Sequence, residues 1–329
     1  MGKFILKRLG ISALILLIVT FLIYSLLRLL PASYVETMAQ QLSQTPGAKP
    51  YEQWVQELNA RYGLDTGLVQ GYLVQLKNML TGNFGDSWKY AVPVTQKFFE
   101  VIGVSLAMGS IALALELVIA LALGIQAARK QYSLTDHAIS VGALLGISLP
   151  TFFFATLLKL IFSVKLGWFD LFGLVGRDHA LLSPWGQLLD TAAHLVLPIV
   201  TIVAVSVGSL MRYTRTNMLE ALGADYIRTA RAKGVPEGQV VLNHAFRNTL
   251  IPLVTVVGGS LPGLFAGALV TETLFAIPGI GYTAYQAMVA GDIPFSMFYL
   301  TFLAALTLLG NLISDVLYAV VDPRVRIGR

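Results

Sequence analysis

The chain has 329 residues, of which 56% are hydrophobic and only 12% are charged, and its mean hydropathy is +0.71. Soluble domains carry roughly a quarter charged residues, so this composition indicates a membrane protein. The chain contains no cysteine and only four scattered histidines, which excludes disulfides, zinc–thiolate sites and thiol nucleophiles and makes any metal site unexpected.

The N-terminal segment, residues 1–30, is predicted to be an uncleaved transmembrane helix. Lys3, Lys7 and Arg8 precede an apolar run over residues 9–30. A signal peptide has a shorter apolar region of about 7–15 residues, and the exit from this run is a poor cleavage site. Cleavage as a signal peptide is the alternative.

Six apolar stretches are long enough for transmembrane helices, each of which needs about 20 residues. They lie at residues 9–30, 101–128, 137–165, 192–211, 249–272 and 296–321. The segments predicted to face one side hold 14 Lys and Arg, whereas the longer segments on the opposite side hold 6. The positive-inside rule therefore predicts that both termini are cytosolic. The same asymmetry accounts for the net charge of +5, so no nucleic-acid partner is predicted.

The long segment at residues 31–100 is predicted to be extracytoplasmic and helical. Apolar residues recur at helical spacing from Tyr51 to Tyr62, where Gly63 ends the pattern, and again from Leu68 to Leu80. Two short amphipathic helices are expected, which would serve as a lid, a docking surface or a cover over the bundle.

The segment at residues 212–248 is predicted to be a cytosolic helical hairpin. A helix is expected to run from Glu220 to Gly234, because basic residues fill its last turns and Pro236 prevents its continuation. A second helix is expected from Val240 to Arg247. Three small residues would let a partner dock closely on the hairpin: Ala221, Ala224 and Ala230.

This hairpin resembles the cytosolic EAA loop of a known family, the permease subunits of binding-protein-dependent ABC importers in the oligopeptide, dipeptide and nickel branch. Arg228-Thr229-Ala230 stands where the general pattern has Glu-Ala-Ala, and the run from Gly234 to Pro252 is longer than the general spacing. Both departures are typical of the peptide branch. Further motifs of that branch follow in order over more than 250 residues: Arg61-Tyr62-Gly63-Leu64-Asp65, Gly82-Asn83-Phe84-Gly85-Asp86-Ser87, Ser148-Leu149-Pro150, Ile277-Pro278-Gly279-Ile280-Gly281 after Glu272, and Asp322-Pro323-Arg324.

The resemblance implies an all-α protein of the bacterial inner membrane with the transmembrane fold of type I ABC importers. A core permease domain would span residues 101–321, with a coupling loop at 212–248 and a cytosolic tail at 322–329. The resemblance assigns coupling to the ATPase to one continuous stretch: Ala224, Asp225, Tyr226, Ile227, Arg228, Thr229, Ala230, Arg231, Ala232, Lys233 and Gly234.

The resemblance also implies a non-catalytic subunit that imports di- or oligopeptides. The sequence has no G-x-x-x-x-G-K-[ST] phosphate-binding loop, so no cofactor is expected on this chain, and ATP and Mg²⁺ are expected on partner subunits. The implied partners are two ATPase subunits, a second homologous permease, an extracytoplasmic peptide-binding protein and the lipid membrane.

Charged, polar and proline residues inside the spans are candidates for the transport path or for gating. These are Glu116, Pro150, Pro262, Glu272, Asn311 and Asp315. Glu116 is equally consistent with a hydrogen bond between helices. Glu272 is expected at an outer gate or a subunit contact. Asn311 and Asp315 share one face of the last span and are candidates to pair with Arg212 or Arg215.

Other functions are weighed against this one. Nickel or another small solute as cargo, and export rather than import, stay open. An intramembrane hydrolase is disfavoured, because Gly146-Ile147-Ser148-Leu149-Pro150 has proline where a nucleophile elbow has its last glycine, and nothing places His194 beside Ser148. A self-powered secondary transporter is disfavoured because the chain has few midplane charges and no evident repeat.

Overall fold

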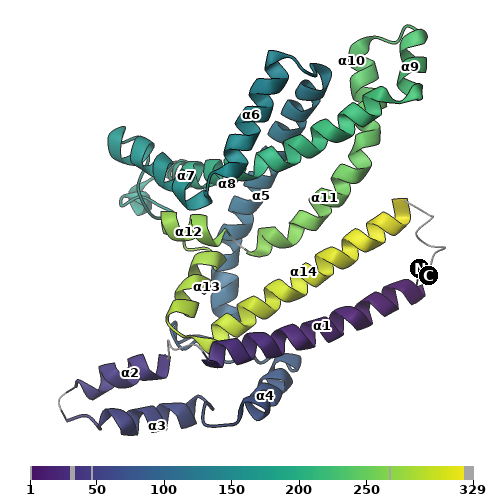
Figure 1. The fold of residues 1–329 in the computed structure, drawn as a ribbon. Helices are drawn as coiled ribbons and strands as arrows, with labels where there is room; N and C mark the ends of the chain where they lie inside the picture. The colour runs from purple at the N-terminus through teal and green to yellow at the C-terminus, as the bar shows by residue number, and fades with distance from the viewer. Residues whose placement is uncertain (1, 30–33, 46, 267, 322–329) are drawn as a thin grey trace. The chain divides into compact units, whose positions relative to one another are not determined.

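The computed structural model describes residues 2–29, 34–45, 47–266 and 268–321 (Figure 1). Every secondary-structure element formed within these ranges is a helix, so the predicted all-α class is confirmed. The chain divides into two compact units. Unit one contains the residues up to Gly103 together with Thr283–Leu312, and unit two contains Val104–Tyr282 and the residues from Ile313 onward. The predicted domain limits, and the side of the membrane that each terminus faces, stay predictions.

Among the described residues, four helices are long and apolar enough to cross a membrane, and two bent helix pairs raise the number to six if each pair is one span. The four helices are α1 (Gly2–Leu29), α5 (Val94–Arg129), α8 (Pro184–Gly223) and α14 (Ile293–Val321). One bent pair joins α6 (Leu134–Ser148) to α7 (Thr151–Leu158) and the π-helix η1 (Lys159–Lys165). The other joins residues 263–275, which include α12 (Leu269–Phe275), to α13 (Ile280–Val289). The predicted number of spans agrees with the larger number, but the predicted span at 249–272 shares only residues 263–272 with the second bent pair.

Two of the predicted spans are broken helices. The span at 137–165 bends by 102° between Ser148 and Thr151. Pro150 precedes α7 there in an extended conformation, and a proline cannot donate the hydrogen bond that would continue α6. The span at 249–272 consists of α11 (Arg247–Ala266) and the first turn of α12. The side chains of Pro262 and Asp315 and all of the tail at 322–329 lie outside the described residues.

In unit one, α1 packs against α4 (Leu68–Leu80) and α14 around Tyr24, Tyr72 and Met297. The Thr20 and Tyr72 side-chain oxygens lie 2.9 Å apart and join α1 to α4 by a hydrogen bond. Figure 1 shows α2 (Tyr34–Ser43) lying alongside α3 (Tyr51–Arg61), and their apolar residues form a second cluster. The two helices expected between residues 51 and 80 are therefore confirmed, and α2 is an additional one.

The loop after α4 is fixed to the start of α14. Asp292 is fully buried and accepts hydrogen bonds from the Ser87 hydroxyl, from Lys89 N at 3.1 Å and from Phe295 N at 3.1 Å. Phe84 packs on Phe298 with ring centroids 4.6 Å apart. The motif at residues 82–87 therefore connects the loop after α4 to the start of α14 within unit one, a role that its sequence alone does not reveal.

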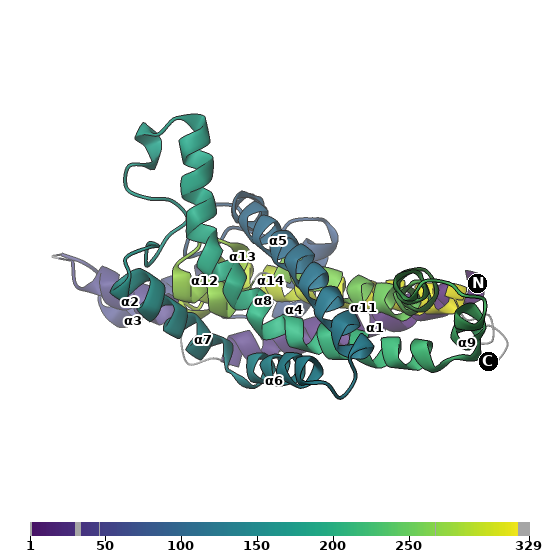
Figure 2. The ribbon, with the colours of Figure 1, turned by 90° about the horizontal axis from the view of Figure 1, so that it is seen from above.

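In unit two, α8 is the element on which the others pack. One buried cluster joins it to α5, α7 and α12 through Met108, Ala155, Leu197 and Phe275. Another joins it to α5, α6 and α11. Figure 2 shows α6 and α7 lying along α8. Short elements complete the unit: η2 (His179–Leu181), α9 (Asp225–Ala232), α10 (Glu237–Gln239) and η3 (Val240–Phe246).

A buried ion pair ties α6 to α8. The Asp136 side chain is 4% exposed, and both of its oxygens accept hydrogen bonds of 2.7 Å from the Arg215 guanidinium. Tyr132 N donates a third hydrogen bond, of 2.9 Å. Arg215, one of the candidate partners of Asp315, therefore pairs with Asp136, and the pairing of Asp315 stays a prediction.

Replacing Asp136 with Ala is expected to destabilise the protein by about 3 kcal/mol, because it leaves a largely buried guanidinium without its partner. Thermal unfolding in detergent measures this effect. The exposed Asp178→Ala should leave the melting temperature nearly unchanged, and Asp136→Leu combined with Arg215→Met should recover most of the loss. Equal melting temperatures for the Asp136→Ala and Asp178→Ala variants would contradict the expectation.

Candidate functional site

The hairpin at residues 212–248 begins with a break that the sequence analysis did not predict. Helix α8 continues to Gly223, Ala224 is extended with ψ 152°, and α9 starts at Asp225. The single helix predicted from Glu220 to Gly234 is therefore wrong. The physical reason is local: Gly223 is a weak helix former, and an acidic residue at 225 favours a new helix N-terminus.

The C-terminal end of α9 is a glycine turn, as predicted. Gly234 has φ +74°, its N–H donates to Arg231 O at 3.0 Å, and Val235 N donates to Ala230 O at 3.2 Å. These two bonds form a Schellman motif, in which the left-handed residue is normally glycine. Gly234 thereby reverses the chain between α9 and α10.

One face of α9 is buried in the hairpin and the other is exposed. Ile227 is 0% exposed, and it packs with Ala221, Ala230 and residues of α8 and η3. Ala221 and Ala230 are therefore covered by side chains of this chain. The prediction that a partner docks against these two residues is wrong. The exposed face carries other residues of the predicted stretch: Asp225, Tyr226, Arg228, Thr229, Arg231, Ala232 and Lys233.

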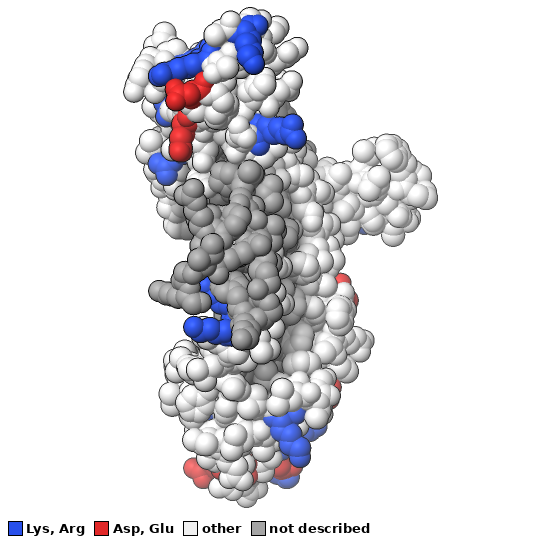
Figure 3. All heavy atoms as spheres, turned by 90° about the vertical axis from the view of Figure 1, so that its right-hand side faces the viewer, with Lys and Arg blue, Asp and Glu red and all other residues white. Residues whose placement is uncertain are grey.

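This exposed face is mainly basic. Figure 3 shows Lys and Arg side chains gathered at the hairpin end of unit two, with acidic side chains among them. Arg231 donates hydrogen bonds of 3.1 and 2.7 Å to the two oxygens of Glu237, which joins α9 to α10. That bond, with the nearby charge of Arg129, lowers the pKa of the Glu237 carboxyl below its ordinary value. The pair is exposed, so it orients the turn more than it stabilises the fold.

The second helix of the hairpin, predicted from Val240 to Arg247, is present but continues further. It is a π-helix, η3, which runs directly into α11. Val240, Val241 and Ala245 are buried against α9 and α8. A displacement of α9 would therefore be transmitted to α11 through packed side chains.

Farther along unit two, Glu272 is fully buried in a network of donors. One carboxylate oxygen accepts from the Ser105 hydroxyl at 2.7 Å and from Ala268 N at 3.1 Å, and the other accepts from Tyr282 N at 2.9 Å. Ser105 in turn accepts from Ile280 N at 2.8 Å. Glu272 thus joins α5, α12 and the start of α13. Because the side chain is buried, the predicted subunit contact through it is wrong, while a role in gating stays a prediction.

The glycine of the Ile277-Pro278-Gly279 motif is required by this network. A Cβ at Gly279 would lie 2.5 Å from both Glu272 Oε2 and Ser105 Oγ. Glu272 and this motif are evident from the sequence, but Ser105 is not, since one serine in an apolar helix is an ordinary feature. The sequence also gives no sign of the hydrogen bond of 2.6 Å from Lys159 Nζ to Leu274 O, which anchors η1 to α12.

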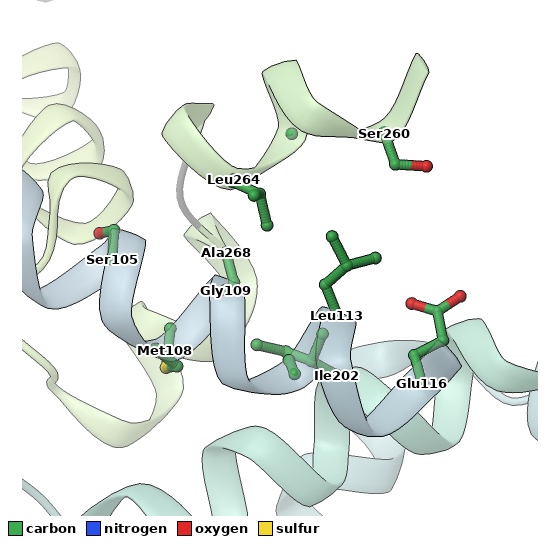
Figure 4. Close-up of a pocket in the computed structure, with 11 residues that line it drawn as sticks. Ser105, Met108, Gly109, Leu113, Glu116, Ile202, Ser260, Leu264 and Ala268 are labelled. Carbon is green, nitrogen blue, oxygen red and sulfur yellow. The ribbon is translucent and has the colours of Figure 1, made fainter. Parts of the chain in front are cut away.

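A cavity of about 160 Å³ lies beside this network, with Ser105 in its lining. Helices α5, α8, α11 and the residue before α12 form its walls, which are mostly apolar or small. The lining is Ser105, Met108, Gly109, Ala112, Leu113, Glu116, Ile202, Ser260, Gly263, Leu264 and Ala268. Figure 4 shows the Glu116 carboxylate and the Ser260 hydroxyl near one end and Ser105 near the other.

Glu116 is the only carboxylate among the described residues of this lining, and it is partly buried. Within the described residues no group donates a hydrogen bond to it, and no Lys or Arg lines the cavity. The interhelical hydrogen bond considered for Glu116 is therefore not formed by this part of the chain. Of the other candidates, Pro150 lies at the bend before α7 and Asn311 is exposed, and neither lines the cavity.

The described residues hold no group of three or more His, Asp or Glu side chains arranged for a metal. His194 Nδ1 lies 2.8 Å from Asp190 O, and its Nε2 lies 3.1 Å from Asp170 Oδ2. Its ring nitrogens therefore face acidic residues and a backbone carbonyl from residues 170–190.

Comparison with known proteins gives a consistent result. Residues 120–327 match the family described as the inner membrane component of binding-protein-dependent transport systems. The oligopeptide transport system permease protein AppB of Bacillus subtilis is 34% identical over 327 residues. The di/tripeptide permease DppB of Pseudomonas aeruginosa is 36% identical over 339 residues, and the dipeptide permease DppB of Escherichia coli is 33% identical over 342. Each alignment covers 99% of this chain and 99% of the relative.

Proposed function

The chain belongs to the family of inner membrane components of binding-protein-dependent transport systems, and we propose that it is the peptide-conducting permease subunit of such an importer. It is a multi-pass inner-membrane protein of an ABC transporter. Its full-length relatives are named for the transport of dipeptides, tripeptides or oligopeptides, and that cargo class is the one proposed here.

The observation that supports this function best is the hairpin. Helix α9 has a buried face made by Ile227 and Ala230 and an exposed, mainly basic face that no described part of unit two covers. A connection between two spans needs no such element. In the proposal, α9 is the coupling helix on the cytosolic side, and residues 224–234 receive the push of an ATPase subunit.

The proposed complex contains two ATPase subunits, a second homologous permease and an external peptide-binding protein. ATP and Mg²⁺ would bind to the ATPase subunits, and this chain would bind no cofactor. Closure of the ATPase pair on ATP would move α9, and the packed junction of η3 and α11 would carry that motion into the spans. Such coupling requires two states that differ in their contacts with the partners.

The family is one of transport components, and we propose that the chain catalyses no reaction of its own. Neither ring nitrogen of His194 faces Ser148, because Nδ1 lies 2.8 Å from Asp190 O and Nε2 lies 3.1 Å from Asp170 Oδ2. An activity that Ser148→Ala abolished without affecting assembly would overturn this part of the proposal.

The function is tested by reconstituting the chain with its proposed partners in liposomes. Peptide together with the binding protein is expected to raise ATP hydrolysis and to enter the liposomes, whereas nickel should do neither. Failure of the ATPase subunits and the second permease to co-purify with the chain would contradict the proposal, as would peptide transport by the chain alone along an ion gradient.

The docking surface is tested by cross-linking. Because the chain has no cysteine, Arg228→Cys would introduce its only thiol. A thiol-to-amine cross-linker is expected to join this variant to an ATPase subunit. The matched variant Ile227→Cys places the thiol on the buried face of the same helix and should give little product. Equal yields from both variants would contradict docking on α9.

A further inference from the structure

The cavity lined by Glu116 suggests how the peptide is recognised, an inference that rests on the proposed function. Glu116 lies near the middle of α5, within the predicted span at 101–128. A carboxylate at that depth is costly unless it has a partner or a function. Two buried carboxylates of unit two, Asp136 and Glu272, have such partners. Glu116 has none within the described residues.

The chemistry of the cavity favours a positively charged organic group. One carboxylate provides the charge, the Ser260 hydroxyl lies near it, and the rest of the lining is apolar or small (Figure 4). A metal ion would require several oxygen or nitrogen ligands, and no such group of acidic and histidine side chains exists in the described residues. No Lys or Arg is among the described residues that line the cavity, so this part of the chain supplies no counter-ion there.

Peptides differ in their side chains but share a free α-ammonium group at the N-terminus. A fixed carboxylate in a permease for varied peptides is useful only if it binds a group that they have in common. We propose that Glu116 binds the α-ammonium group of the peptide in this cavity. The small residues Gly109, Ala112 and Gly263 leave the volume in which the first residue of the peptide is accommodated.

The experiment compares binding of Ala-Ala and N-acetyl-Ala-Ala, which lacks the ammonium group. The assembled complex, without nucleotide and without the binding protein, is tested by equilibrium dialysis with labelled peptides. The wild-type complex is expected to bind Ala-Ala about tenfold or more tightly than the acetylated peptide, as befits a charge-assisted hydrogen bond. Glu116→Gln should remove this preference, and Glu116→Asp should retain part of it.

The dependence on pH provides an independent measurement. A peptide α-amino group has a pKa of about 8, so it loses its charge as the pH rises through that value. Wild-type affinity for Ala-Ala should fall about tenfold from pH 7 to pH 9, while affinity for the acetylated peptide should stay constant. The Glu116→Gln complex should show no such fall.

Asp178→Asn is the control, because Asp178 is an exposed carboxylate of unit two that does not line the cavity. It should retain the wild-type preference. If the Glu116→Gln complex still bound Ala-Ala more tightly than the acetylated peptide, the role of Glu116 would be overturned. The proposed function in peptide transport would not be affected by that result. Loss of the second permease from the Glu116→Gln complex would also overturn it, since Glu116 would then be a subunit contact. A wild-type complex that neither binds nor transports peptide would overturn the proposed function itself.

Discussion

Replacing Gly234 with Val is expected to reduce coupled transport by about five- to thirty-fold while leaving the protein folded. Gly234 has φ +74°, a conformation that costs an L residue about 1–2 kcal/mol and a β-branched one more. A Cβ added at this position would meet no atom within 4 Å, so we expect the effect to come from the backbone conformation. A strained turn would break the hydrogen bonds donated by the N–H groups of residues 234 and 235. Helix α9 would then lose its packing against η3.

The measurement is peptide uptake per ATP hydrolysed in the reconstituted complex. Gly234→Asn should be nearly normal, because asparagine tolerates the left-handed conformation. Gly238→Val is the matched control: Gly238 lies in the same hairpin, has open space around it and lacks a positive φ. Unchanged uptake and unchanged ATPase stimulation in the Gly234→Val complex would contradict the assignment of coupling to α9.

Much of the fold is predictable from sequence, because lipid imposes strong and simple constraints. Apolar stretches of about 20 residues locate the spans, and helical spacing locates α3 and α4. The breaks are harder to predict. Pro150 interrupts a span by a bend of 102°, whereas Pro198 lies inside the continuous helix α8. Hydropathy alone does not distinguish these two prolines, since the packing around each decides whether the helix continues.

The candidate site is only partly predictable, for a similar reason. The stretch ending at Gly234 is evident from basic residues followed by glycine, but the break at Ala224 depends on how α9 packs against α8 and η3. Glu116 and Glu272 look alike in the sequence, as isolated carboxylates in apolar helices. In the structure Glu272 accepts hydrogen bonds from three donors, whereas Glu116 accepts none within the described residues. The donors to Glu272 include Ser105, which precedes it by 167 positions.

Glu272→Gln is therefore expected to be severely destabilising. Glutamine replaces one acceptor oxygen with an NH₂ group, which would face a backbone N–H or the Ser105 hydroxyl and accept from neither. The loss of charge-assisted bonds in a fully buried site should cost about 3 kcal/mol and lower the melting temperature in detergent by roughly 5–10 °C. Transport should fall as well, because the connection from α12 to α13 loses its anchor on α5.

The same substitution at Glu116 provides the control, because Glu116→Gln changes the same atoms where no described group donates to the carboxylate. Its melting temperature should stay within about 2 °C of wild type.

Ser105→Ala removes one donor to Glu272 and should cost about 1 kcal/mol. If the two side chains form one network, Ser105→Ala combined with Glu272→Gln will be less destabilising than the sum of the single variants. Strict additivity would separate the Ser105 bond from the others and contradict a shared anchor. A Glu272→Gln variant as stable as Glu116→Gln would contradict the network altogether.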